Sequence, residues 1–416
     1  MRVPDGFLQF IYLRNLTNSK SYLAHLQEQI TTQNKVNRPS DNPLSNARIM
    51  RLRQQINSND AFAYNINNGL SMIEHSITSM ESIQSEVKKV MVDLTSMNNA
   101  TVDEELNSYA SDIDAALNSI LDLANSEYNN QYSFGGTDHS TKPFGFNSDK
   151  TAVVVNANDI GGVQKIKLNN SVFQKINITG KDLFLPVLNQ SGNLDSTQAV
   201  GSVQSNSNTI YDADGNEYTI NVDYKKTADN TYDLSYTIVD SNSNVVSSDT
   251  VNDLKFDASS GKLISVAGQD PKDIKISLPD NKINLVIDFD TLKEKSGATN
   301  FVTSLSQKAD IFNTLLSIKN KLLNGEKPNQ TQMQIVNDFN QHVLNQLSEA
   351  GNISNRLNSS LDLLQNQKFE LVNLLSTEND VDMAKALTDL ESAQFSLDAG
   401  YKISSMILPR SLLDYL

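Results

Sequence analysis

The chain of 416 residues contains no cysteine and no tryptophan. The absence of cysteine excludes disulfides and every metal site built on thiolates. It also suits a protein that is exported unfolded through a narrow route. No run of residues reaches the roughly 18 apolar positions that a membrane span needs. Residues 1–16 lack the apolar centre and cleavage site of a signal peptide, so we expect any export to use another route.

Basic residues are scarce as well. The chain has 34 Lys and Arg against 49 Asp and Glu, which gives a net charge of −15. Nucleic acids and anionic membranes attract basic surfaces, so neither is expected as a partner. The histidines are scattered at positions 25, 75, 139 and 342, and no HExxH, GxSxG, P-loop or GxGxxG motif occurs. We therefore expect no enzyme, no metal and no cofactor.

One short segment has the spacing of calcium ligands. Asp212, Asp214 and Asn216 alternate as in a calcium loop, but the glycine stands at 215 and no glutamate occupies the twelfth position. A hairpin turn is the favoured interpretation of this segment, because Asp-Gly is a strong turn signal.

Apolar residues recur every seventh position in the first and last thirds of the chain, as in helices that pack lengthwise. The first row is Ile66, Ile73, Met80, Val87 and Leu94. The second row is Val336, Val343, Ala350, Leu357, Leu364 and Leu371. The two rows predict that the chain leaves a helical rod and later returns to it.

The pattern predicts helices over about residues 7–33, 43–98, 103–128, 330–377 and 380–407, and a further helix from about 300 to 324. The second of these would be roughly 80 Å long. Two prolines bracket the segment Asn37–Pro43, where the first helix must end, and Pro43 suits the first position of the next helix.

Strand signals fill the middle of the chain. Alternation begins near Tyr132 and predicts short strands over 151–155, 165–168 and 174–178. The Ser- and Asn-rich stretch 186–208 is interpreted as a linker or long loop. Residues 209–290 then predict a small antiparallel all-β module, with strands over 218–224, 232–239, 254–256, 263–266, 274–278 and 283–289.

The expected fold is α+β, a long antiparallel helical coiled-coil bundle from the two ends of the chain with an inserted antiparallel all-β domain. We divide it into an N-terminal assembly helix (1–42), a helical rod with a β-hairpin region (43–185), the β domain (186–295), a returning rod (296–378) and a C-terminal assembly helix (379–416). The end helices lack complete apolar rows, so we expect them to be disordered in the monomer.

Several motifs together resemble the bacterial flagellin-like family, in the form found at the junction of hook and filament. The segments that carry the resemblance are Asn37–Pro43, Tyr132–Gly136, Lys142–Phe144, Asn177–Phe184, Asp380–Ala384 and Leu412–Leu416. The resemblance covers about residues 1–185 and 295–416. The β module, through Ile210–Asn216 and Leu254–Asp257, is similar to an outer domain of flagellar hook proteins. Residues Pro4–Gly6 depart from the family pattern.

The resemblance implies a structural, extracellular subunit of the flagellum that joins the hook to the filament. Its implied partners are the first hook-associated protein, flagellin, further copies of itself in a ring, and an export chaperone. Export would pass through the flagellar export apparatus.

Apolar residues near both ends have too few partners within one chain, so we predict that they make assembly contacts. These are Phe7, Phe10, Ile11, Leu16, Leu23, Leu397, Tyr401, Leu408, Leu412, Leu413 and Tyr415. Two other functions remain open: a flagellin of the filament itself, and a secreted adhesin-type β module on a helical stalk. The Asp-Tyr-Leu ending and the hook-like β module favour the junction subunit over flagellin.

Overall fold

The computed structural model describes residues 5–97, 103–269, 274–277, 283–297 and 299–407. The chain divides into two compact units. The first contains residues 1–64 and 360–416, and the second contains residues 65–359. Two of the long helices, α2 (Pro43–Met97) and α6 (Gln330–Asn379), contribute to both units.

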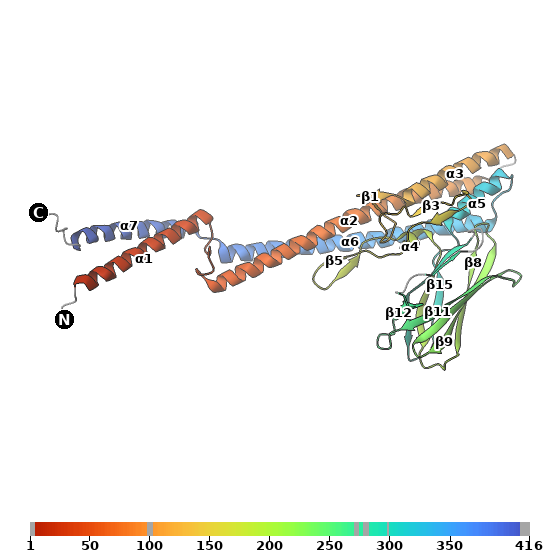
Figure 1. The fold of residues 1–416 in the computed structure, drawn as a ribbon. Helices are drawn as coiled ribbons and strands as arrows, with labels where there is room; N and C mark the ends of the chain where they lie inside the picture. The colour runs from red at the N-terminus through yellow and green to blue at the C-terminus, as the bar shows by residue number, and fades with distance from the viewer. Residues whose placement is uncertain (1–4, 98–102, 270–273, 278–282, 298, 408–416) are drawn as a thin grey trace. The chain divides into compact units, whose positions relative to one another are not determined.

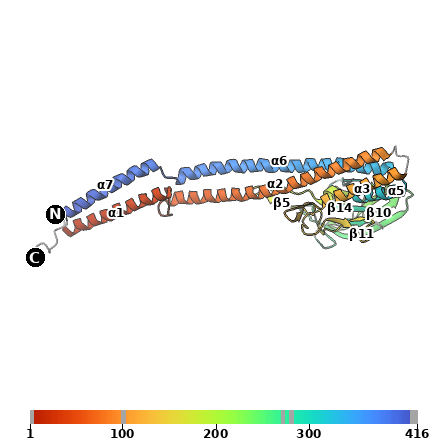
Figure 2. The same cartoon turned by 90° about the horizontal axis from the view of Figure 1, so that it is seen from above.

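Among its described residues, the first unit is helical apart from two short linkers. Its end helices α1 (Asp5–Thr32) and α7 (Met383–Ile407) run side by side (Figures 1 and 2). In the same unit, α2 and α6 are joined by two ion pairs, Arg48 with Glu378 and Asp60 with Lys368. Since the higher number on one helix pairs with the lower number on the other, these two helices are antiparallel. The predicted bundle of N- and C-terminal helices is thereby confirmed.

In the second unit, the first heptad row and the part of the second row from Val336 to Leu357 form the helical core. Every member of the row from Ile66 to Leu94 on α2 has at most 2% of its surface exposed. On α6, Val336, Val343, Ala350 and Leu357 are completely buried. Helix α3 (Asp103–Ala124) packs against α5 (Ile311–Leu323), whose N-terminus is capped by the Asp310 carboxylate. Among the described residues, no helix is both long and apolar enough to cross a bilayer.

Three short hairpins follow α3. They pair β1 (Glu127–Tyr128) with β2 (Gln131–Tyr132), β3 (Phe144–Phe146) with β4 (Val153–Val155), and β5 (Lys165–Lys167) with β6 (Phe173–Lys175). The one-turn helix α4 (Gly180–Phe184) comes next, and the Thr179 hydroxyl caps it by accepting a bond from the Asp182 amide.

A cluster of phenylalanines joins these hairpins to the helices. The ring of Phe184 on α4 lies 5.7 Å from Phe134, 5.1 Å from Phe144, 5.1 Å from Phe312 on α5 and 6.3 Å from Phe339 on α6. All five side chains are nearly or completely buried. The cluster therefore ties the hairpin region, α5 and α6 into one core at the entrance to the β domain.

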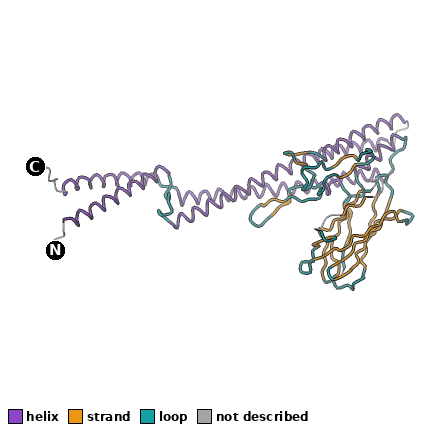
Figure 3. The backbone as a smooth tube through the Cα atoms, viewed as in Figure 1, coloured by secondary structure: helices purple, strands orange, loops and turns teal. Residues whose placement is uncertain are grey.

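The inserted β domain has two sheets (Figure 3). The five-stranded sheet has the order β12-β11-β10-β9-β8 and is antiparallel throughout. Its strands are β8 (Val203–Tyr211), β9 (Glu217–Ala228), β10 (Thr231–Asp240), β11 (Val245–Phe256) and β12 (Leu263–Val266). Its inner face carries residues such as Ile220, Tyr224 and Tyr232, which are completely buried.

The second sheet has the order β13-β14-β7-β15. Its strands are β7 (Val187–Asp195), β13 (Ile274–Ser277), β14 (Asn284–Lys295) and β15 (Val302–Leu305). One pair departs from the expected antiparallel pattern, because β14 runs parallel to β7. The chain enters the β domain through β7 and leaves it through β15, and these two strands are hydrogen-bonded neighbours.

Two local predictions are wrong. The stretch 186–208 is not a loop, because Val187–Asp195 and most of Val203–Tyr211 are strands. Leu188 and Leu194 on β7 are completely buried, and the buried Gln190 side chain accepts a bond from the Tyr224 hydroxyl of the other sheet, whereas Val200 and Val203 are exposed. Phe301 and Leu305 do not belong to a helix, since residues 302–305 pair with β7 before α5 begins at Ile311.

Candidate assembly surfaces

The pairing of α1 with α7 rests on few specific contacts. The Tyr12 hydroxyl donates to the Gly400 carbonyl. The ammonium group of Lys20 lies 5.4 Å from the centre of the Tyr401 ring, which is a cation–π distance. Among the described side chains of this pair, the buried apolar ones are Leu26, Ala386 and Ala393. A core of this size provides little hydrophobic stabilisation for two helices of more than 20 residues.

The linker that follows α1 and the linker between α6 and α7 lie at the same level and hydrogen-bond to each other. The Lys35 amide donates to the Asn379 carbonyl at 2.5 Å, and the Val381 amide donates to the Gln33 carbonyl at 3.0 Å. Asn34 and Asp380 thereby form an antiparallel β-bridge. We call this contact between residues 33–35 and 379–381 the clasp.

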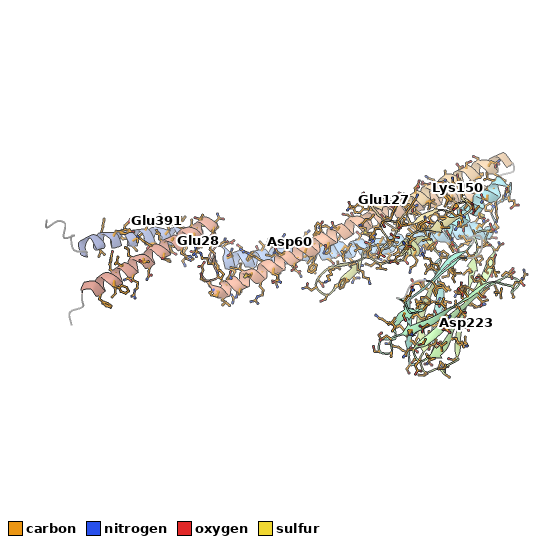
Figure 4. The ribbon with its side chains drawn as sticks, in the orientation of Figure 1. Glu28, Asp60, Glu127, Lys150, Asp223 and Glu391 are labelled. Atoms are coloured by element: carbon orange, nitrogen blue, oxygen red, sulfur yellow. The ribbon has the colours of Figure 1, made fainter. Side chains whose placement is uncertain are left out.

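The linker between α1 and α2 is stabilised by its own side chains. The Asp41 carboxylate accepts bonds from the Arg38 amide at 2.8 Å and the Asn37 amide at 3.1 Å. The bond from Arg38 is the main cause of a lowered pKa of Asp41. The Asn42 side chain caps α2 by accepting from the Ser45 amide at 3.1 Å, as the predicted turn requires. Arg38 also pairs with Glu28 (labelled in Figure 4) at 3.2 Å.

The residues predicted to make assembly contacts differ in their exposure. Phe7, Phe10 and Tyr401 are exposed, whereas Ile11, Leu16, Leu23 and Leu397 are half-buried between α1 and α7. The remaining four, Leu408, Leu412, Leu413 and Tyr415, lie outside the described residues. The structure therefore brings the two ends together, and no contact with another chain tests these positions.

Sequence reasoning missed several large apolar residues that the first unit exposes. Phe395 on α7 has 77% of its surface exposed, which is the largest value among the large apolar residues whose side chains the structure describes. The others on these helices include Leu13, Tyr22, Leu44, Met50, Tyr64, Leu363, Phe369, Leu374, Leu387 and Ile403. These residues are apolar but lie outside the heptad rows, so the sequence alone could have identified them as exposed apolar positions. Such a density of exposed apolar side chains is typical of an interaction surface.

The segment Asp212–Asn216 is a hairpin turn between β8 and β9. The Asp212 carboxylate accepts the Asn216 backbone amide at 2.8 Å and the Asn216 side-chain amide at 2.9 Å, and Gly215 takes a positive φ of 80°. Two backbone carbonyls of this turn accept hydrogen bonds from helices of the same unit. Lys321 donates to the Asp214 carbonyl at 3.1 Å and Gln332 donates to the Ala213 carbonyl at 3.0 Å.

This turn therefore fixes the β domain to α5 and to the start of α6. A second attachment is the buried ion pair between Lys181 on α4 and Asp288 on β14, whose charged atoms are 2.5 Å apart. Across the described parts of the chain, no group of three or more His, Asp or Glu side chains is arranged to hold a metal ion.

Comparison with known proteins accounts for both halves of this architecture. Residues 7–139 match the family model of the bacterial flagellin N-terminal helical region, and residues 333–416 match that of the bacterial flagellin C-terminal helical region. The chain belongs to the flagellin-like family. Residues 180–359, whose last part overlaps the C-terminal match, match the flagellar basal body protein FlaE D2 domain. This member of the flagellin-like family thus carries a hook-type insertion.

Two curated relatives are similar over part of the chain. The chain is 28% identical over 191 residues to flagellar hook-associated protein 3 of Escherichia coli K12, covering 44% of this chain and 57% of that protein. It is 30% identical over 149 residues to flagellar hook-associated protein 3 of Salmonella typhimurium LT2, covering 35% of this chain and 46% of that protein. The matches span about half the length of these relatives. The flagellar junction protein FlgL from Legionella pneumophila, a solved structure, is 17% identical with a TM-score of 0.36, covering 88% of this chain and 100% of that chain.

Proposed function

We propose that this protein is a structural subunit of the bacterial flagellum that joins the hook to the flagellin filament, outside the cell. The observation that supports this role most directly is the combination of two domain types in one chain. The flagellin-type helical ends suit contact with flagellin-like neighbours, and the hook-type D2 domain is inserted between them. Two relatives with the name flagellar hook-associated protein 3 support the same role.

The partners that we propose are the first hook-associated protein on the hook side, flagellin on the filament side, and copies of this chain in a ring. A flagellar export chaperone would protect the C-terminal helix before export. Exposed apolar residues at the chain ends, such as Phe7, Phe10 and Tyr401, are the proposed contacts with axial neighbours. Leu408, Leu412, Leu413 and Tyr415 are proposed for the same role from the sequence alone.

Electron microscopy of a strain that lacks the gene tests this function. We expect hooks without filaments, with flagellin released into the medium, and we expect recovery when the wild-type gene is restored. Full-length filaments on the hooks of the deletion strain would contradict the proposal.

The main alternative is that the chain is a filament flagellin. It predicts that the protein is the bulk component of purified filaments, whereas a junction subunit is present only in trace amounts. Quantitative mass spectrometry of sheared filaments separates the two. The adhesin alternative predicts that the β domain binds a ligand, and it is excluded if deleting residues 187–305 leaves adhesion unchanged.

A further inference from the structure

The two polypeptide segments of the first unit carry opposite net charges. Residues 1–64 contain eight Lys and Arg against four Asp and Glu. Residues 360–416 contain four Lys and Arg against nine Asp and Glu. The whole chain has a net charge of −15, so copies would repel each other unless such local differences were matched at their contacts. One segment of this unit is therefore basic and the other is acidic.

Helices α2 and α6 each carry an exposed stripe in which two apolar residues flank a charged one. On α2, Met50 and Tyr64 flank Arg53, and we call these three residues the basic stripe. On α6, Leu363 and Leu374 flank Glu370, and we call these the acidic stripe. More than half of each of the four apolar side chains is exposed. Neither Arg53 nor Glu370 has an ion-pair partner among the residues that the structure describes.

The two stripes lie on opposite faces of the α2–α6 pair. An α-helix turns by about 100° per residue. By this count, the three residues of the basic stripe are displaced by about 40–100° from the buried Ile49 of α2, in the direction of increasing residue number. The three residues of the acidic stripe are displaced by about 80–120° from the buried Leu364 of α6, in the opposite direction. When two helices pack antiparallel, rotation toward higher residue numbers leads to the same face of the pair on both helices. Stripes displaced in opposite senses therefore lie on opposite faces of the α2–α6 pair.

From this geometry we infer that the basic stripe of one subunit packs against the acidic stripe of a second copy of this chain. The inference rests on the proposed function, because it names the lateral contact by which copies would form a ring. Opposite faces with complementary charge and apolar flanks give a head-to-tail contact, which repeats around a ring or a helix instead of closing as a dimer.

The axial positions of the residues agree with such a contact. The ion pairs Arg48–Glu378 (3.7 Å) and Asp60–Lys368 (2.7 Å, Asp60 labelled in Figure 4) fix which levels of α2 and α6 coincide within one subunit. By this register, Tyr64 lies near the level of Leu363, and Arg53 lies about four residues, or about 6 Å, from the level of Glu370. A stagger of about 5 Å between neighbouring copies brings Arg53 to Glu370 and Met50 to Leu374.

The absence of cysteine permits a direct test by disulfide cross-linking. The variant Met50→Cys/Leu374→Cys carries one thiol in each stripe. Mild oxidation of isolated flagella that contain this variant, and of the purified full-length chain at high concentration, should give a ladder of multimers of this chain. A matched control is Leu44→Cys/Leu374→Cys, because Leu44 is exposed to the same 64% as Met50 but lies on the face of the acidic stripe. We expect no ladder from the control.

Charge reversal tests the ionic part of the contact. Arg53→Glu and Glu370→Arg, each introduced into the Met50→Cys/Leu374→Cys background, should lower the multimer yield about fivefold, because like charges then face each other. The double reversal Arg53→Glu/Glu370→Arg should restore the yield. Loss in both single variants without restoration would overturn the pairing of these two residues.

The outcomes separate this inference from the proposed function. If the wild-type gene restores filaments but the cysteine pair gives no multimers, or gives the same ladder as the control, the lateral contact is wrong and the junction role stands. If the cross-links join this chain to another protein, the partner is not a second copy. If the deletion strain keeps its filaments, the junction role fails, and the ladder of the purified chain alone decides whether the stripes pair.

Discussion

Replacing Phe184 by alanine tests whether the phenylalanine cluster holds the second unit together. Phe184 is fully buried and its ring contacts four other phenylalanine rings from the hairpin region, α5 and α6. The change removes the centre of the cluster and leaves its neighbours facing a cavity.

The structure indicates a large effect. Truncating a buried phenylalanine to alanine typically costs about 3–5 kcal/mol. The edge-to-face contacts with Phe134 and Phe144, at interplanar angles of 86° and 74°, each add about 0.5–1.5 kcal/mol beyond burial. Part of that contribution is already included in the first figure, so we expect a loss of about 4–5 kcal/mol in the free energy of unfolding of this unit.

Urea unfolding followed by circular dichroism and by tyrosine fluorescence measures this loss. The matched control is Phe173→Ala, because Phe173 lies in the nearby hairpin but has 56% of its surface exposed. The control should change stability by less than about 1 kcal/mol. A loss below about 1.5 kcal/mol for Phe184→Ala, with an unchanged urea dependence, would refute the view that this cluster is the central core of the unit.

Three further predictions concern other parts of the molecule. Lys181→Met should lower the free energy of unfolding by about 3–5 kcal/mol, because Asp288 is left charged and buried, and Lys181→Met/Asp288→Leu should recover most of it in the same urea assay. The Thr197 amide and hydroxyl and the Gln198 side chain hold the pKa of Asp195 at about 2, below its usual 3.8. The resulting stabilisation is present above pH 4 and is lost as the pH falls from 3.8 towards 2, so melting temperatures should drop over that range, and Asp195→Asn should flatten the drop. Limited proteolysis of the monomer should cut residues 1–40 and 380–416 before residues 65–359, and equal resistance of both parts would argue against folding of the ends on assembly.

Much of the helical architecture could be predicted from the sequence, because helix periodicity is a local property. The row from Ile66 to Leu94 identified the buried face of α2, and prolines 39 and 43 identified the break before it. The antiparallel return of the chain followed from a second row of the same period. The resemblance to the flagellin-like family identified the same ends.

The strands β7, β8 and β15 were not predictable in this way. The sequences of β7 and β8 are rich in Ser, Asn and Gln, and β15 is only four residues long, so the apolar residues of these strands form a recognisable pattern only when partner strands cover them. Pairing of β7 with β14 joins residues about one hundred positions apart, which no local pattern records. The clasp was missed for the same reason, since it consists of backbone bonds between residues about 345 positions apart.

The clasp also couples the lengths of two distant loops. Adding one residue between Thr32 and Asn34 while leaving 379–382 unchanged would turn α1 by about 100° relative to α7, or would break the bridge between Asn34 and Asp380. Either result would move Phe7 and Phe10 of α1 to a different position relative to α7. Insertions between a helix of this pair and the clasp are therefore tolerable only when one in each chain segment matches the other.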